Sequence, residues 1–385
     1  MDFSVNGHSD ARDAAEAWRS QRSLGPHARR GQRILLVLLM LTGACALSPA
    51  MADNYFDRYG LQPASPELDL GAQPLGYPSG VISAVIQRDS ILRRALAEIR
   101  QPLKVHPFRR GADMIGLLGE QRLEAGLLGD MPTLLAAAAG QVLIVGLVKQ
   151  TSTAIVAKGD VQVGDLAGKR IGYVEGSSAH LTLLQGLASA GIQETQVKMV
   201  PVGVVDMPQA LERGDIDAFA AWEPAPTLAL ARSDKNHIVF RSQSSDYFVI
   251  ERRFEQRSPQ AASLLVAAYL RALEWMRMSS ANLERAARWA MADTQTFDGK
   301  ASGLTAAQIA TITRREILNV PSAPHILVHA EAPPLQQEFQ FLRKLGKLPP
   351  SSTWAQVETA FRYDGLARVQ GMARAYQLRS YDYSD

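Results

Sequence analysis

The sequence predicts an α/β fold of two lobes, each a mostly parallel sheet flanked by helices. Three observations support this prediction: strands and helices alternate from Leu68 onward, the alternation begins again near Val161, and acidic motifs recur at a fixed spacing. Strict alternation of strand, loop and helix is typical of parallel sheets with right-handed crossovers. The 385 residues are enough for two domains.

The expected elements follow from apolar periodicity along the chain. The first half has expected strands over 68–71, 103–106, 123–128 and 142–148, and expected helices over 81–97, 113–120 and 132–139. The second half has expected strands over 169–174, 197–200 and 216–221, and expected helices over 179–190 and 206–213. Beyond residue 250 the sequence predicts amphipathic helices that pack on the first lobe, over 261–278, 283–294, 304–318 and 335–345.

Acidic motifs repeat between the two halves. Glu124 corresponds to Asp217, and Asp130 corresponds to Glu223, with the same offset of 93 residues. Short motifs also recur by chance, so a coincidence between two amphipathic strands is the alternative. We interpret the repeat as two lobes of similar build. Lobe 1 is expected over 53–157 and lobe 2 over 158–246, with a return to lobe 1 and the C-terminal helices over 247–385.

The N-terminus has the order of a signal peptide. Basic residues up to Arg33 precede an apolar run from Ile34 to Leu41, and an Ala-x-Ala site ends at Ala52. We therefore expect residues 1–52 to be an N-terminal extension and signal peptide, cleaved after Ala52. Cys45 leaves a lipid anchor as an alternative. The pair Arg29-Arg30 leaves open export by the twin-arginine or the Sec route.

Composition and motifs disfavour several function classes. The net charge of +3 is spread along the chain and does not indicate a nucleic-acid surface. Cys45 is the only cysteine, so an exported chain that starts after it has neither a disulfide nor a thiol nucleophile. The phosphate-binding loop pattern G-x-x-x-x-G-K-[ST] is missing from the sequence. Prolines flank the group His325, His329 and Glu331, so we expect no metal there, and we expect no cofactor.

A loop of small residues indicates an anion site. Gly176, Ser177 and Ser178 join an expected strand to a helix that begins near Ala179. One serine is expected to cap this helix, and both hydroxyls can donate hydrogen bonds. Backbone N–H groups at a helix start carry partial positive charge and converge on one point. The loop therefore predicts binding of a small anionic group.

Two prolines mark further helix starts near acidic residues. Pro132 and Pro224 suit the first position of a helix, and Asp130 or Glu223 caps that helix or, alternatively, contacts a ligand. Ligands of open α/β sheets bind outside the carboxyl ends of the strands. These loops are therefore expected to face a cleft between the lobes.

Five segments, taken in order, resemble one protein family: 129–136, 166–172, 176–180, 214–218 and 222–224. They look like the solute-binding proteins of ABC importers for aliphatic sulfonates, taurine and nitrate, over about residues 68–250. The resemblance implies a type II periplasmic-binding-protein fold with the ligand in the cleft between the lobes. It also implies a monomeric periplasmic protein that delivers its ligand to a membrane permease driven by a separate cytoplasmic ATPase.

The resemblance also implies roles for individual residues. The loop 176–178 takes the oxyanion, Trp222 walls the cleft or belongs to the core, and His180 faces the ligand or the solvent. Glu223 stands where the family often has Asp, which moves the carboxylate by one methylene. The expected ligand-binding residues are Gln73, Gly129, Asp130, Met131, Gly176, Ser177, Ser178, His180, Trp222, Glu223 and Tyr247.

The sequence indicates the chemical class of the ligand less directly than it indicates the binding residues. Trp222 and Met131 favour an organic tail, so the expected ligand is an alkyl or aryl sulfonate, taurine-like. Sulfate esters, nitrate and a pyrimidine are alternatives, and so is a ligand-sensing subunit. An enzyme on the same scaffold is a further class, but the sequence has no G-x-S-x-G nucleophile elbow.

Overall fold

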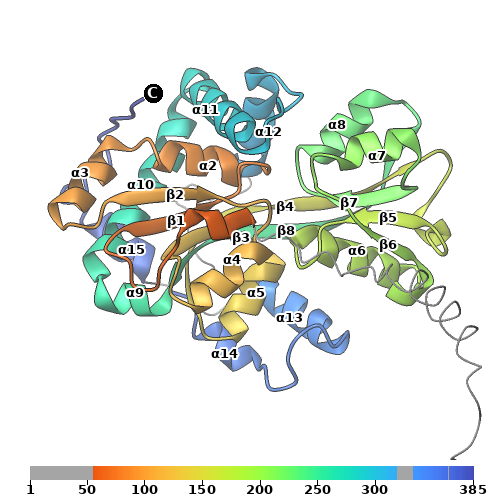
Figure 1. The fold of residues 1–385 in the computed structure, drawn as a ribbon, viewed down its shortest axis with the longest axis horizontal. Helices are drawn as coiled ribbons and strands as arrows, with labels where there is room; N and C mark the ends of the chain where they lie inside the picture. Colours follow the sequence, from red (N-terminus) through yellow and green to blue (C-terminus); the bar gives the residue numbers. More distant parts are fainter. Residues whose placement is uncertain (1–54, 319–332, 363) are drawn as a thin grey trace, which may run out of the picture. The chain divides into compact units, whose positions relative to one another are not determined.

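The computed structural model describes residues 55–318, 333–362 and 364–385, and the predicted signal peptide lies outside them. In this part of the chain eight strands form one mixed sheet (Figure 1), in the order β2-β1-β3-β8-β4-β7-β5-β6. The strands are β1 (Leu68–Ala72), β2 (Leu103–Pro107), β3 (Ala125–Gly129), β4 (Val142–Lys158), β5 (Arg170–Tyr173), β6 (Lys198–Pro201), β7 (Ala218–Ala221) and β8 (Asn236–Glu251). The predicted α/β class is confirmed.

Two long strands, β4 and β8, join the two halves of the sheet. They pair antiparallel from Val142 opposite Glu251 to Lys158 opposite Asn236. The sequence prediction ended the first of these strands at residue 148 and placed no strand over 236–251. Both errors have one cause, because polar residues interrupt the apolar pattern in the middle of each strand.

The two halves of the sheet have the same build. In the first, β1 lies between β2 and β3 and pairs with both in parallel; in the second, β5 lies between β6 and β7 in the same way. Glu124 Oε2 accepts a hydrogen bond from the backbone N–H of Asp69 at the start of β1 (2.9 Å). Asp217 Oδ2 accepts one from the N–H of Arg170 at the start of β5 (2.8 Å). The acidic repeat therefore reflects equivalent positions in two similar units.

Each half is a mostly parallel sheet, as predicted, and β4 and β8 join the two into one continuous sheet. Strand β3 pairs antiparallel with β8, and β7 pairs antiparallel with β4. Residues 56–385 form one compact unit. The predicted lobe boundaries after residues 157 and 246 stay predictions.

Helices cover both faces of the sheet. In the first half they are α2 (Ser79–Ile86), α3 (Ser90–Glu98), α4 (Ala112–Gly119) and α5 (Asp130–Ala138). In the second half they are α6 (Ser178–Ser189), α7 (Met207–Arg213) and α8 (Ala225–Arg232). In Figure 1, α7 and α8 lie on one face of the second half and α6 on the other. A buried apolar cluster fills each side, around Phe219 on the first and Leu183 on the second.

The single helix predicted over 81–97 is two helices, α2 and α3. The break falls at Asp89, whose Oδ1 accepts a hydrogen bond from Leu92 N (2.9 Å) as the N-cap of α3. An aspartate side chain competes for backbone N–H groups and so favours a helix start over a helix interior. The apolar periodicity alone did not reveal this start.

The C-terminal helices pack mainly on the first half, as predicted. Helix α10 (Pro259–Met278) contacts α2 and α3, and α11 (Ser280–Asp298) contacts α2. The remaining helices are α9 (Arg252–Arg257), α12 (Ala306–Leu318), α13 (Pro334–Lys344), α14 (Trp354–Glu358) and α15 (Gly365–Gly371), and a 3-10 helix, η1, spans Tyr55–Tyr59. Among the described helices none combines the length and the apolar character needed to cross a membrane.

A buried ion pair fixes α10 to the break between α2 and α3. Arg271 and Asp89 are each 1% exposed, and the Arg271 guanidinium contacts Asp89 Oδ2 at 2.7 Å. The same guanidinium donates to the carbonyl of Tyr376 (2.7 Å) and so also holds the C-terminal segment.

We predict that Arg271→Met lowers the free energy of unfolding by about 3–5 kcal/mol, because it leaves Asp89 buried without a counter-charge. Arg94→Met is the control, since its ion pair with Asp382 is exposed and is worth about 0–1 kcal/mol. Urea denaturation of both variants checks this. Equal losses for the two would contradict it.

Candidate functional site

A cavity lies where the two halves of the sheet meet. It encloses about 420 Å³ of empty space, including the part open to solvent. Five of the predicted site residues line it: Gln73, Gly129, Ser177, Ser178 and Trp222. They come from the β1–α2 loop, the start of α5, the start of α6 and the β7–α8 loop. The structure therefore brings together predicted residues from both halves.

Four helices begin at this cavity. Ser79 is the first residue of α2, Gly111 and Gly129 are the N-caps of α4 and α5, and Ser177 is the N-cap of α6. All four line the cavity. The free N–H groups of a helix start carry partial positive charge, so four starts around one space favour an anion.

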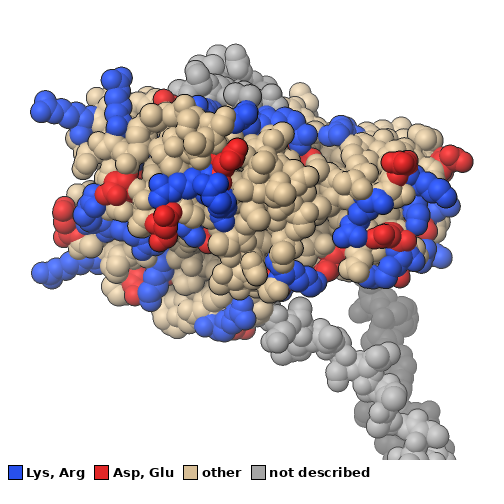
Figure 2. Space-filling view, turned by 90° about the horizontal axis from the view of Figure 1, so that it is seen from above, with Lys and Arg blue, Asp and Glu red and all other residues tan. Residues whose placement is uncertain are grey.

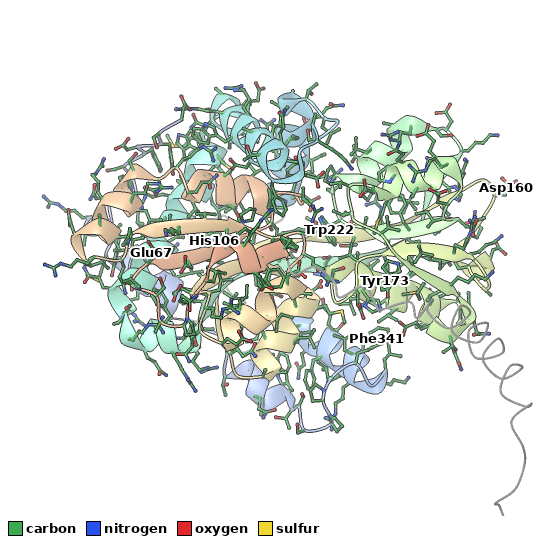
Figure 3. All side chains as sticks on the ribbon, viewed as in Figure 1. Glu67, His106, Asp160, Tyr173, Trp222 and Phe341 are labelled. Carbon is green, nitrogen blue, oxygen red and sulfur yellow. The ribbon has the colours of Figure 1, made fainter. Side chains whose placement is uncertain are left out.

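Close approach across the cavity depends on two glycines. A Cβ on Gly76 would lie 2.6 Å from Nε1 of Trp222, and a Cβ on Gly129 would overlap Oγ of Ser178. Trp222 and Ser178 belong to the second half of the sheet and the two glycines to the first. Figure 3 shows Trp222 between the two halves. A side chain at either position would force the facing Trp222 or Ser178 side chain to shift.

The two serines of the predicted anion loop have different partners. Ser177 caps α6, as expected: its Oγ accepts from His180 N (3.3 Å) and donates to the carbonyl of Val174 (2.6 Å). Its hydroxyl hydrogen is therefore already used. The Ser178 hydroxyl forms a hydrogen bond with the Asp130 carboxyl.

Asp130 lies behind the cavity wall, buried beside Ser178. Its Oδ1 accepts from Met131 N (2.7 Å) and its Oδ2 from Ser245 N (3.1 Å). Burial raises the pKa of Asp130, and these hydrogen bonds oppose that rise. Asp130 is the first residue of α5, whose N-cap is Gly129, so its side chain sits beside the helix start and positions Ser178 instead of capping the helix. Pro132, expected at the first helical position, is the third residue of α5.

The Glu223 carboxylate is bound by residues of two helices, α12 and α8. Its Oε1 forms an ion pair with Arg315 of α12 (2.8 Å), and its Oε2 accepts from Thr227 N (3.3 Å) in α8. Glu223 does not line the cavity. Pro224 precedes the first residue of α8 as its N-cap.

His180 forms a hydrogen bond with the backbone of the anion loop, residues 176–178. Its Nδ1 accepts a hydrogen bond from Gly176 N (3.3 Å), which leaves the hydrogen on Nε2 to face Glu194 Oε1 (3.4 Å). Burial lowers the pKa of His180, and the charge of Glu194 opposes this shift. Gly176 has a φ of +69°, which favours glycine. Neither residue lines the cavity.

Met131 and Tyr247, predicted as wall residues, are core side chains with 4% and 3% exposure. Neither lines the cavity. Burial raises the pKa of the Tyr247 hydroxyl well above its ordinary value. Gln73 does line the cavity, and its amide Nε2 donates to the carbonyl of Leu127 (2.6 Å).

The most informative lining residue, Lys149 of β4, was not predicted from the sequence. It is 2% exposed and lines the cavity, and no described residue forms a hydrogen bond or an ion pair with its ammonium. The signal was present as one lysine between two apolar stretches, 142–148 and 154–157. Asp246, Tyr77 and Ser79 are further lining residues that were not predicted.

The described residues include no cluster of metal-ligating side chains, and the face drawn in Figure 2 is not uniformly basic. His325, His329 and Glu331 lie outside the described part of the chain. On the face shown in Figure 2, Lys and Arg side chains are interspersed with Asp and Glu. That face does not resemble a nucleic-acid surface.

The buried carboxyl of Glu338, which interacts with the charge of Asp130, is expected to make the stability of the protein depend on pH. Glu338 of α13 has no partner for its Oε2 among the described residues. Burial, and then the charge of Asp130, raise the pKa of Glu338 well above its ordinary value. Folding therefore takes up a proton, so stability declines as the pH rises from the unfolded-chain pKa of about 4.3 towards the raised pKa.

We predict that Glu338→Gln makes stability less dependent on pH between 5 and 8, by up to about 1.4 kcal/mol per pH unit for one proton. Melting temperatures across this range check it. Glu274→Gln, on the exposed side of α10, is expected to follow the wild type. If the stability of Glu338→Gln depends on pH as steeply as that of the wild type, Glu338 is not the group that causes the pH dependence.

Comparison with known proteins identifies relatives. Residues 105–279 match the family model described as NMT1/THI5 like. A protein of Escherichia coli (strain K12) named for binding aliphatic sulfonates is 31% identical over 176 residues, 43% of this chain and 53% of that protein. The taurine-binding periplasmic protein of the same organism is 30% identical over 165 residues, 40% of this chain and 51% of that protein. The chain thus spans about half the length of these relatives.

Solved structures share the fold. The periplasmic aliphatic sulphonate binding protein SsuA from Escherichia coli superposes with a TM-score of 0.59 at 20% identity, over 78% of this chain and 99% of SsuA. The desulfurization enzyme DSZB has the same fold, with a TM-score of 0.52 at 15% identity, over 80% of this chain and 99% of DSZB. The fold alone therefore does not separate binding from catalysis.

The motifs, the fold and the family match agree with one another. The resemblance to sulfonate- and taurine-binding proteins inferred from the sequence is confirmed. The match to the NMT1/THI5-like family model covers residues 105–279, less than half of the chain.

Proposed function

We propose that the chain is the substrate-binding component of an ABC importer and captures a small organic oxyanion, an alkyl or aryl sulfonate or a taurine-like compound. The observation that carries this proposal is Lys149, a buried cation that lines the cavity without a described partner. Burying an unpaired ammonium costs free energy, and an oxyanion in the cavity compensates its charge. The four helix starts add partial positive charge at the same place.

The remaining walls favour an organic anion over a bare inorganic ion. Trp222 and Tyr77 present aromatic side chains to the cavity, which suits an apolar tail. Sulfate esters offer the same chemistry and are the next candidates.

The chemistry of the site supports binding instead of catalysis. The Ser177 hydroxyl donates to a carbonyl, and the His180 ring faces Gly176 and Glu194, so these residues do not form a nucleophile and base pair. The single cysteine, Cys45, precedes the predicted cleavage site.

Location and partners belong to the same proposal. We place the protein in the periplasm as a monomer that delivers its ligand to a membrane permease with a separate ATPase. The predicted export signal and the periplasmic relative support this placement. Uptake of the labelled ligand by cells of the source organism that lack the gene is expected to fall, and to return when the gene is restored.

We predict that Lys149→Met weakens sulfonate binding by about 10- to 100-fold, because the variant loses a charge-assisted hydrogen bond worth about 1.5–3 kcal/mol. Calorimetric titration with alkanesulfonates, taurine, sulfate esters and nitrate measures this effect. Lys158→Met, a matched change on the same strand, should leave affinity unaltered, since Lys158 Nζ donates to the Glu212 carbonyl outside the cavity. Unchanged affinity in Lys149→Met would remove the basis of the proposal.

A further inference from the structure

The cavity is lined by an acidic side chain as well as a basic one. Asp246 of β8 lines it together with Lys149 of β4, and the two residues are register partners in the antiparallel pair. Residues directly opposite in such a pair project to the same face of the sheet. Yet no ion pair joins Lys149 and Asp246 among the contacts of the described residues. Two opposite charges thus face one cavity without neutralising each other directly.

The Asp246 carboxylate is only partly satisfied by the protein. Its Oδ2 accepts a hydrogen bond from Ser79 Oγ (2.6 Å), and no described donor reaches its Oδ1. Oδ1 lies on the side of Gly129, 3.6 Å from where a Cβ of that residue would stand. Gly129 itself lines the cavity. A carboxylate oxygen is therefore left to accept from a ligand.

The aromatic walls suit a cation beside this carboxylate. Tyr77 and Trp222 line the same cavity as Asp246. Aromatic faces attract ammonium groups, and a carboxylate nearby adds a full counter-charge. Glu223, the acid that the family resemblance places near the ligand, is already paired with Arg315. Asp246 is thus the lining acid available for a ligand cation.

From these contacts we infer that the ligand is a short zwitterion. Its oxyanion lies at Lys149 and the helix starts, and its ammonium group lies at Asp246. This inference rests on the proposed function and deepens it. A ligand with only an anionic group would leave Asp246 uncompensated and would be repelled by it. A zwitterion satisfies both charges at once.

Calorimetric titration with matched ligand pairs tests the inference. The first pair is 3-aminopropane-1-sulfonate and propane-1-sulfonate, and the second is 4-aminobutanoate and butanoate, all at pH 7, where the amines are protonated. In at least one pair the wild type is expected to bind the amino compound about tenfold more tightly or better. Asp246→Asn should reduce this ratio to about threefold or less, by weakening the amino compound. Asp234→Asn, at an exposed position, is the control.

The outcomes separate the inference from the proposed function. If propane-1-sulfonate binds as tightly as its amino analogue, or if Asp246→Asn leaves the ratio unchanged, the zwitterion inference is overturned and the oxyanion site stands. If Asp246→Asn strengthens all anions equally, Asp246 is only a counter-charge for Lys149, which also overturns the inference. If none of the four compounds binds at millimolar concentration, both claims fail. The melting temperature of each variant confirms that it is folded.

Discussion

The antiparallel pairing of β4 and β8 is the constraint on which the candidate site depends. These strands are the connection between the halves of the sheet, and their register places Lys149 opposite Asp246. A shift of one residue would turn both side chains to the other face. The pairing of β8 with β3 sets Asp246 opposite Gly129 at the end of β3, next to the start of α5. Backbone hydrogen bonds thus fix the charges that the cavity presents.

Around this pair, glycines and helix starts shape the cavity. Gly76 and Gly129 allow Trp222 and Ser178 to approach from the other half, so that the charged lining residues lie between closely packed walls. Charged groups interact more strongly in such a place than in bulk water. Ion pairs behind the walls, Arg315–Glu223 and Lys347–Glu194, connect the C-terminal segments to the second half. Glu223, which the family resemblance places near the ligand, is held in an ion pair with Arg315 and does not line the cavity.

Sequence patterns predicted much of the fold and part of the site. Apolar periodicity found most helices and parallel strands, because those elements are buried and short. It missed the length of β4 and all of β8, because polar residues interrupt the apolar pattern of both strands. Two of these polar residues, Lys149 and Asp246, line the cavity. Motif order indicated Gly129, Ser177, Ser178 and Trp222 as neighbours, and the position of Gln73 in the first strand-to-helix loop added this residue. It could not separate Asp130, His180 and Glu223 from true lining residues, because their position depends on contacts with Ser245, Glu194 and Arg315.

The central claim is that Lys149 binds the oxyanion of an organic ligand. A crystal structure of the protein with 2-bromoethanesulfonate tests it most directly, because the anomalous signal of bromine fixes the direction of the ligand. We expect a sulfonate oxygen about 2.7–3.2 Å from Lys149 Nζ and the bromine beside Trp222. A sulfonate bound away from Lys149, for example at the partly exposed Arg110, would contradict the account.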